Sequence, residues 1–507
     1  MCRTYGANGM PEQPFCSRRD VLRGAVAGAA AYALSPLAGW AAASAKRPLN
    51  IVFILIDDLG VMDLGVQGST YYQTPNTDRL AAEGMRFVNG YAAHPVCSPT
   101  RASLLTGRYP HRLHLTTYIP GAKADNRRLI EPDWIKYTRY SETTYAETFR
   151  AAGYRTCHIG KWHVGAKPEL QGFDVVTTAG YKKDPDDPWY VDQYTAAAEK
   201  FMTDNRDRPF LLTLSHGTVH VPLYERDEKI ATYRDKPAGA NGQNNPTMAA
   251  MIETMDDSVG RVLAKIKELG IEDSTAVVFF SDNGGLSTAT SNKPYRGGKS
   301  LLYEGGIRVP MIIKWPGVTA PGSTCDARVI SNDLYPTFLA MAGLPLKPAQ
   351  HLDGMDLTPL LRGKGQLDRK TLYFHYPHYH SRAPHSAVIS ENWKLIRFYH
   401  QDTVQLFDLA ADPGETSDLA EQKPKIAAAL DAMLTRHLST IGAQLPTPNP
   451  DYDPDQPHRK PVRQKHDPYE WKQEGDTRTY VTDPSLDYGQ QWTVETMLSG
   501  QASQPTN

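Results

Sequence analysis

The chain alternates between continuous apolar runs and amphipathic stretches. Residues 50–56, 210–214 and 276–280 are rich in β-branched and aromatic side chains and end in polar residues. Such runs are typical of strands that are buried on both faces of a mainly parallel sheet. Shorter apolar runs at residues 155–159 and 309–315 predict further strands of the same kind.

The clearest helical pattern lies between these runs. Apolar residues within 248–269 are spaced by three and four, and Gly270 then supplies a natural helix end. Strand and helix patterns alternate across residues 50–345, which predicts an α/β fold with a central, mostly parallel sheet flanked by helices. Ligands of such sheets bind beyond the carboxyl ends of the strands.

The pattern changes near residue 370. Four short strand-like pieces, at 372–376, 386–390, 393–399 and 404–409, precede a helical pattern at 424–438. We therefore expect a smaller C-terminal α+β subdomain. The domains predicted are a catalytic domain at 46–368, this subdomain at 369–445, and a polar extension at 446–507 that wraps the surface or stays mobile.

The first 45 residues resemble an export signal. Paired arginines, Arg18 and Arg19, precede an apolar run at 25–34 and a small-residue stretch at 41–45. This order predicts a twin-arginine signal peptide, and therefore export, most simply to the periplasm. The alternative is an N-terminal membrane anchor, but the run is well short of the roughly 20 residues that span a bilayer. No stable membrane anchor is expected.

Composition narrows the possible partners and the redox chemistry. The 507 residues are 40% hydrophobic and 22% charged, with a formal net charge of −1. A neutral chain of this size forms sizeable cores but has no field to hold a polyanion, so nucleic acid is excluded as a partner. Without the signal, Cys97, Cys157 and Cys325 remain, and at most Cys157 and Cys325 form a disulfide.

Residues 97–101, Cys-Ser-Pro-Thr-Arg, carry the most informative chemistry. Ser98 is a candidate cap, Pro99 suits a first turn, and Gly107 suits a helix end, so Cys97 is expected at a helix N-terminus. Arg101, one turn later, can fold back over the sulfur. The pattern predicts an anion site with a reactive thiol. The alternative is a buried structural cysteine.

Cys-Ser-Pro-Thr-Arg followed by Ala-Ser-Leu-Leu-Thr-Gly-Arg resembles the signature of type I sulfatases, a family of alkaline-phosphatase-like fold. The resemblance covers residues 50–421 and extends to bacterial polysaccharide and aryl sulfatases. It implies that a separate maturation enzyme oxidises Cys97 to formylglycine (3-oxoalanine). The hydrated aldehyde is then the nucleophile, since one hydroxyl attacks sulfur and the other allows sulfate to be expelled.

Four polar residues after two predicted strands match the family's metal ligands. Asp57 and Asp58 follow the first strand, and Asp282 and Asn283 follow a later one. The resemblance implies that they hold one Ca²⁺ ion with Cys97 beside it. This oxygen donor set suits Ca²⁺ or Mg²⁺ better than zinc. Taken alone, an Asp-Asp pair at a strand end is more typical of a turn.

Cationic and imidazole side chains match the remaining family positions. Lys161 and His163 lie in Gly-Lys-Trp-His-Val-Gly, and Lys299 lies in Arg-Gly-Gly-Lys-Ser. The resemblance implies that these residues, with Arg101, bind and orient sulfate and nucleophile. His220 is expected to assist the leaving group, and His216 is a less favoured candidate. Lone residues of these types are usually solvated surface groups.

The expected function is that of an exported calcium-dependent sulfatase acting on a sulfated carbohydrate or an aryl sulfate. Two alternatives remain: a phosphomonoester or phosphonate-ester hydrolase of the same superfamily, and a non-catalytic, calcium-dependent glycan-binding protein. A phosphate-binding P-loop is excluded because Lys293 replaces the required glycine. Residues 374–382 either contact a sugar or form an edge strand with a solvated loop. Residues 406–415 are interpreted as a structural turn.

Overall fold

The computed structural model describes residues 48–121, 126–178, 184 and 186–456, and the backbone of two strands within 469–482. The predicted signal peptide lies outside these residues, as does most of the predicted C-terminal extension. None of the helices in the described part of the chain combines the length and apolarity needed to cross a bilayer.

An eight-stranded sheet forms the centre of the molecule. In spatial order its strands are β10 (Ser323–Cys325), β2 (Met85–Phe87), β9 (Met311–Lys314), β8 (Thr275–Ser281), β1 (Asn50–Ile56), β7 (Phe210–Ser215), β5 (Arg155–Gly160) and β6 (Val175–Thr177). All of them run in one direction except β9, which is antiparallel to both β8 and β2. The predicted mostly parallel sheet is therefore confirmed, with one reversed strand.

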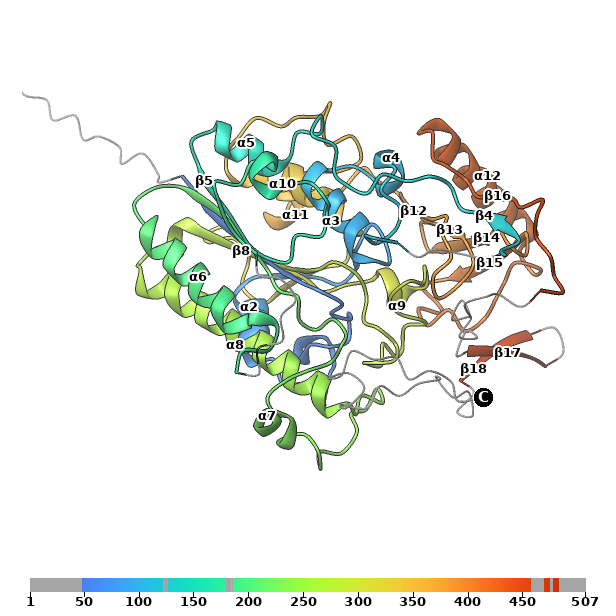
Figure 1. Ribbon diagram of the computed structural model, residues 1–507, viewed down its shortest axis with the longest axis horizontal. Helices are drawn as coiled ribbons and strands as arrows, with labels where there is room; N and C mark the ends of the chain where they lie inside the picture. Colours follow the sequence, from blue (N-terminus) through green and yellow to red (C-terminus); the bar gives the residue numbers. More distant parts are fainter. Residues whose placement is uncertain are drawn as a thin grey trace, which may run out of the picture. The chain divides into compact units, whose positions relative to one another are not determined.

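Helices cover both faces of this sheet (Figure 1). One face carries α2 (Pro75–Glu83), α6 (Val191–Asp204), α7 (Asp227–Ala231) and α8 (Pro246–Glu268). The other carries α3 (Cys97–Thr106), α5 (Tyr145–Ala151), α10 (Leu334–Met341) and α11 (Thr358–Leu361). Two four-residue helices, α4 (Pro110–Leu113) and α9 (Glu304–Ile307), lie in connecting segments.

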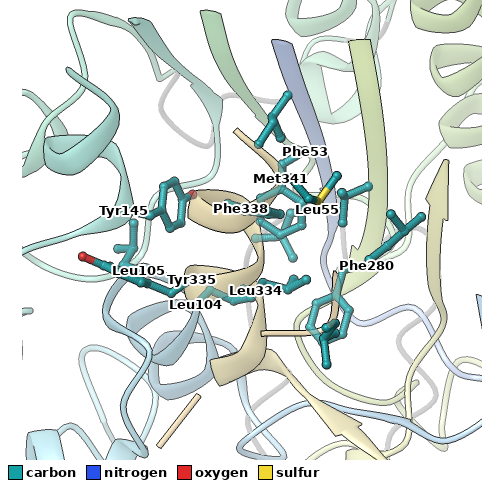
Figure 2. Close-up of a cluster of buried hydrophobic side chains, with 14 of the residues drawn as sticks. Phe53, Leu55, Leu104, Leu105, Tyr145, Phe280, Leu334, Tyr335, Phe338 and Met341 are labelled. Carbon is teal, nitrogen blue, oxygen red and sulfur yellow. The ribbon is translucent and has the colours of Figure 1, made fainter. Parts of the chain in front are cut away.

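Successive side chains of β1 point to opposite faces of the sheet, so this one strand contributes to two hydrophobic cores. Phe53 and Leu55 pack with α10, where Figure 2 shows Phe338 and Met341 beside them. Val52 and Ile54 point to the opposite face and pack with α8. All seven residues of β1 are buried, as expected for a continuous apolar run. Burying each large apolar side chain contributes about 1.5–3 kcal/mol.

The C-terminal part is an antiparallel sheet with a helix on one face. Its strands, in order, are β12 (Thr371–Tyr376), β13 (His385–Ser390), β14 (Trp393–Phe398) and β15 (Thr403–Asp408), followed by α12 (Pro424–Thr440). The predicted α+β character is confirmed. Val388 and Leu395 face α12, whereas Phe374 and Ile396 pack against residues such as Tyr91 and Ile307 of the preceding part of the chain.

Three two-stranded ladders complete the structure. They are β3 (Gly90–Tyr91) with β11 (Val329–Ile330), β4 (Leu129–Ile130) with β16 (Thr447–Pro448), and β17 (Tyr469–Glu474) with β18 (Thr477–Thr482). The domain boundary predicted between residues 368 and 369 precedes β12 and stays a prediction. Cys157 and Cys325 are both free thiols, so the optional disulfide is not formed.

Candidate active site

Four neighbouring parallel strands end at one edge of the central sheet. Because β1, β5, β7 and β8 all point the same way, the polar residues that follow them meet at this edge. The pairs brought together are Asp57 and Asp58, Lys161 and His163, His216 and His220, and Asp282 and Asn283. The sequence-predicted site residues therefore lie in one region of the fold.

The acidic group is fully buried and only partly satisfied. Asp57, Asp58, Asp282 and Asn283 are each at most 1% exposed. The Asn283 Nδ2 atom donates to Asp58 Oδ1 at 2.8 Å, and among the described residues the Asn283 Oδ1 atom has no hydrogen-bond partner. Asp57 Oδ1 also has no hydrogen-bond partner in the described part of the chain, and Arg101 Nη2 lies 3.9 Å from it. Buried oxygens in this state carry a desolvation penalty that a bound cation would remove.

Cationic side chains pair with these carboxylates. Lys161 Nζ contacts Asp57 Oδ2, and Lys299 Nζ lies 2.7 Å from Asp58 Oδ2. Arg101 Nε donates to Asp282 Oδ2 at 2.7 Å. The residues expected to bind sulfate thus lie directly beside those expected to bind the metal.

The charged side chains of the site shift one another's pKa values. Burial by itself would raise the pKa of Asp57, but the charges of Lys161, His220 and Arg101 outweigh it and hold that pKa well below its usual range. Burial and the adjacent Asp57 charge raise the pKa of Asp282 to about 7.

These residues fit a divalent metal ion. Asp57, Cys97 and Asp282 offer ligand atoms within 4.8 Å of one another, and so do Asp57, Asp58 and His220. The two unpartnered oxygens, on Asp57 and Asn283, belong to the same group. Carboxylate and amide oxygens form a hard donor set, which favours Ca²⁺ or Mg²⁺ over a softer metal.

Helix α3 begins at Cys97, as the sequence predicted, and ends before Gly107 with φ +68°. The expected capping role of Ser98 is wrong. The capping position is Val96, which makes no side-chain bond, and the Ser98 Oγ atom instead accepts the backbone N–H of Ile119 at 3.1 Å. Ser98 therefore fastens a neighbouring loop to the helix that carries Cys97.

Cys97 and His163 lie within hydrogen-bond distance of each other. The Cys97 Sγ atom lies 3.2 Å from Nδ1 of His163, and Nε2 of His163 lies 2.6 Å from the carbonyl oxygen of Ile119. That carbonyl can only accept, so Nε2 carries the proton and Nδ1 is left as an acceptor. Burial and the Lys161 charge lower the pKa of His163 to about 3, which keeps the ring neutral.

Arg101 lies beneath the site and is 3% exposed. Besides Asp282, its guanidinium donates to the Lys161 carbonyl at 2.9 Å and to Ser215 Oγ at 2.7 Å. It therefore links the ends of β5, β7 and β8. The sequence reasoning missed Ser215, because a single serine at a strand end has no distinguishing pattern.

The two histidines that follow β7 have different surroundings. His220 Nε2 lies 3.8 Å from Asp58 Oδ2, and Nδ1 donates to the Val221 carbonyl. His216 is fully buried, and its Nε2 atom lies 2.9 Å from Ser258 Oγ on α8. His220 therefore lies beside the Asp58 carboxylate, whereas His216 contacts α8.

One further residue, His380, was not assigned a role from the sequence, where only its segment, 374–382, was considered for sugar contact. His380 lies 2.9 Å from the Tyr376 hydroxyl and its ring centroid is 4.9 Å from that of Tyr118. Burial, together with the Lys299 charge, lowers the pKa of His380 to about 4. The segment around it follows edge strand β12, and Tyr376 and His378 are buried rather than solvated.

Comparisons with known proteins point to one family. The family model described as Sulfatase matches residues 49–344, and the model described as N-sulphoglucosamine sulphohydrolase, C-terminal, matches residues 297–444. The chain is 32% identical to Arylsulfatase A of Homo sapiens, over 79% of this chain and 88% of that protein. It is 34% identical to N-acetylgalactosamine-6-sulfatase of Mus musculus, over 66% and 70%.

A solved structure shows the same architecture. The crystal structure of Ps i-CgsB in complex with k-i-k-neocarrahexaose matches with a TM-score of 0.67 and 28% identity, covering 77% of this chain and 93% of that one. With a family model that spans more than half of the chain and curated relatives more than 30% identical over most of their length, this chain belongs to the sulfatase family and is a sulfuric ester hydrolase.

Proposed function

We propose that this protein is an exported, calcium-dependent sulfatase that hydrolyses a sulfate ester of a carbohydrate or an aryl alcohol at a formylglycine derived from Cys97. The observation that carries the proposal is the position of Cys97, buried at a helix N-terminus between oxygen donors and cationic side chains. The names of the relatives, an arylsulfatase and an amino-sugar sulfatase, support this substrate class.

Calcium would be held by Asp57, Asp58, Asp282 and Asn283. Its charge would polarise a sulfate oxygen and stabilise an oxyanion on the nucleophile. With the carboxylates engaged by a metal, Lys161 and Lys299 would be available to an anionic ester, since both now pair with those carboxylates. Positive groups fixed in a buried site stabilise the charge of the transition state.

His163 is suited to handle the proton of the nucleophile. The sulfur of Cys97 marks the position that a hydroxyl of the modified residue would take, 3.2 Å from the Nδ1 acceptor. His163 at this position would accept the hydroxyl proton, and the Ile119 carbonyl keeps its ring in the required tautomer.

His220 is suited to the opposite task. Its Nδ1 proton is engaged by the Val221 carbonyl, so a second proton would be carried on Nε2, on the side of Asp58. Burial lowers the pKa of His220, and the Asp58 carboxylate beside Nε2 opposes that shift. A proton held on Nε2 would be donated to the departing alcohol oxygen. Neighbouring histidines with different hydrogen-bond partners can thus serve as base and acid in one site.

The test is sulfate release from sulfated monosaccharides, polysaccharides and an aryl sulfate, using protein produced together with a maturation enzyme. Cys97→Ala should reduce release by at least about 10³-fold because the nucleophile is lost. Cys157→Ala is the matched control, since Cys157 is equally buried but lies in β5 outside the site. A chelator should abolish the activity and added Ca²⁺ should restore it.

Three outcomes would contradict the proposal. Cys97→Ala with full activity would remove formylglycine from the mechanism. Full activity of the chelator-treated protein would exclude calcium from the mechanism. Faster hydrolysis of the phosphate ester than of the sulfate ester of the same alcohol would favour a phosphoesterase. The mass of the Cys97 peptide shows whether the residue was converted before each assay.

A further inference from the structure

A loop of residues 296–303 contacts the two segments that carry the metal ligands and the nucleophile. The Lys299 N–H donates to the Gly285 carbonyl at 3.0 Å, and the Ser300 N–H donates to the Pro95 carbonyl at 2.7 Å. The loop is therefore fastened close to Asn283 on one side and to Cys97 on the other. The position of the Lys299 side chain depends on how this loop is held.

Helix α9 lies in close contact with the loop. A Cβ atom on Gly305 would lie 2.5 Å from the Gly297 carbonyl oxygen, and one on Gly306 would lie 2.0 Å from that of Leu301. At such separations only glycine fits. The backbone of α9 consequently cannot shift without moving the segment that carries Lys299.

A buried cluster of charges anchors the first residue of α9. Glu304 Oε1 lies 3.0 Å from Lys394 Nζ, and its backbone N–H donates to Glu415 Oε2 at 2.7 Å. Lys394 Nζ lies 2.8 Å from Glu415 Oε1. The second oxygen of Glu304 accepts from the Tyr91 hydroxyl at 2.9 Å and contacts Arg308.

The members of this cluster come from separate parts of the chain. Lys394 lies on β14 of the C-terminal sheet, on the face that includes Ile396 and meets the catalytic part, and Glu415 follows β15. All three ion-pair partners have 0% side-chain exposure. Removing one member of such a buried cluster leaves an uncompensated charge, so its geometry is strongly constrained.

We propose that Lys394 and Glu415 are positioning residues that set the place of Lys299 by holding Glu304 and α9. The inference rests on the proposed role of Lys299 in sulfate binding. It also assigns a function to part of the segment at 406–415, which the sequence suggested only as a turn. The C-terminal sheet thereby takes part in building the sulfate site.

The test is Lys394→Met with two readouts. Amide hydrogen exchange in peptides that cover 297–301 should accelerate at least tenfold, because Lys299 and Ser300 lose a fixed frame. The KM for a sulfate ester should rise at least tenfold, with a smaller change in kcat. The matched control is Arg397→Met, on the same strand, where the ion pair at 2.6 Å reaches Asp431 of α12 instead. It should leave both readouts unchanged.

A double variant separates positioning from general damage. In a Lys299→Met background, Lys394→Met should have almost no additional effect on KM, because its effect is transmitted through Lys299. Equal losses in both backgrounds would overturn the inference, and so would unchanged exchange in a folded Lys394→Met protein. If that protein does not fold, Glu415→Gln retains the acceptor for the Glu304 N–H and takes its place.

The exchange readout is independent of catalysis. Wild-type protein that releases no sulfate, together with accelerated exchange in Lys394→Met, would overturn the proposed function and leave the positioning role in place. If the wild type releases sulfate but Lys394→Met and Arg397→Met do not differ, the positioning role would be overturned and the proposed function would stand.

Discussion

At the scale of single residues, the proposed role of His163 as a base depends on its tautomer, which the Ile119 carbonyl fixes. His163 has φ +58°, a left-handed conformation that non-glycine residues seldom adopt. Asn tolerates this conformation well, so His163→Asn should keep the backbone while removing the imidazole acceptor at Nδ1. We expect kcat to fall by about 10²–10⁴-fold, with KM changing much less, since a general base acts mainly in the transition state. Steady-state kinetics on a sulfate ester measures both constants.

The control for this variant is Trp162→Phe, at the preceding position in the same loop. Its ring packs against His158 and Phe173 rather than against Cys97. It should retain kcat within a few-fold. A His163→Asn protein that has converted Cys97 and yet loses less than tenfold in kcat would show that another group takes the proton.

The residue scale also shows how far the sequence could predict the site. Apolar runs that end in acids placed Asp57 and Asp282 at the carboxyl ends of strands, where ligands of parallel sheets bind, but their role as metal ligands came from the family resemblance. The placement of Lys299 in the site was predicted only from the family resemblance, since no periodic pattern connects Lys299 to Asp58. Ser98 was misassigned because capping preference is local, whereas its hydroxyl binds a loop that folds over the helix.

At the scale of elements, α8 stabilises the start of α2 through one carboxylate. Asp256, in the middle of α8, accepts the backbone N–H groups of Asn76 and Thr77 at 2.9 and 2.7 Å, and also their side chains. Thr74, at the capping position of α2, makes no such bond to the helix backbone. Asp256→Ala should therefore lower the free energy of unfolding by about 2–4 kcal/mol, since buried donors lose their acceptor. Urea unfolding measures the difference.

The adjacent position supplies the control. Asp257 is 57% exposed and pairs with Lys229 on the surface, so Asp257→Ala should change the free energy of unfolding by less than about 1 kcal/mol. Equal effects at Asp256 and Asp257 would show that the carboxylate does not serve as a cap for α2.

The longer strands of the central sheet, the C-terminal strands and α8 could be predicted from apolar patterns, but the short strands β2, β6 and β10 and the direction of β9 could not. β1 and α8 have the bounds that their patterns indicate to within a few residues, because each pattern reflects burial of a defined face. The apolar run of β9 gave no sign of its reversal. The connection from β8 to β9 contains only the four-residue helix α9, which is consistent with an antiparallel neighbour rather than a helical crossover.

At the scale of the whole molecule, the start of the C-terminal extension ties distant segments together. β16 pairs with β4, and Asn449 donates through Nδ2 to the Arg127 carbonyl at 2.7 Å. Asn126 Nδ2 donates to the Asp453 carbonyl at 2.8 Å, and the Asp453 N–H returns a bond at 2.9 Å. Residues 447–456 thus hold the segment 126–131 in place.

That segment in turn holds the chain that leads to His380. The Tyr379 N–H donates to Glu131 Oε1 at 2.5 Å, and the Tyr379 hydroxyl accepts the Leu129 N–H at 3.2 Å. The guanidinium of Arg127 lies over the Tyr379 ring at 4.3 Å. A path of direct contacts therefore runs from the extension to a residue whose pKa responds to the Lys299 charge.

The chain length that the site requires can be tested by two truncations. A protein that ends at Leu445 loses every contact between the extension and 126–131, and each lost hydrogen bond weakens that segment by about 0.5–1.5 kcal/mol. We expect its KM for a sulfate ester to rise about three- to tenfold, and exchange to increase in peptides covering 126–131 and 376–380. A protein that ends at Gln456 keeps those contacts and should match the full chain in both measurements. If both truncated proteins match the full chain, the path through Tyr379 has no part in substrate binding, and the extension from 446 onward is dispensable for the reaction.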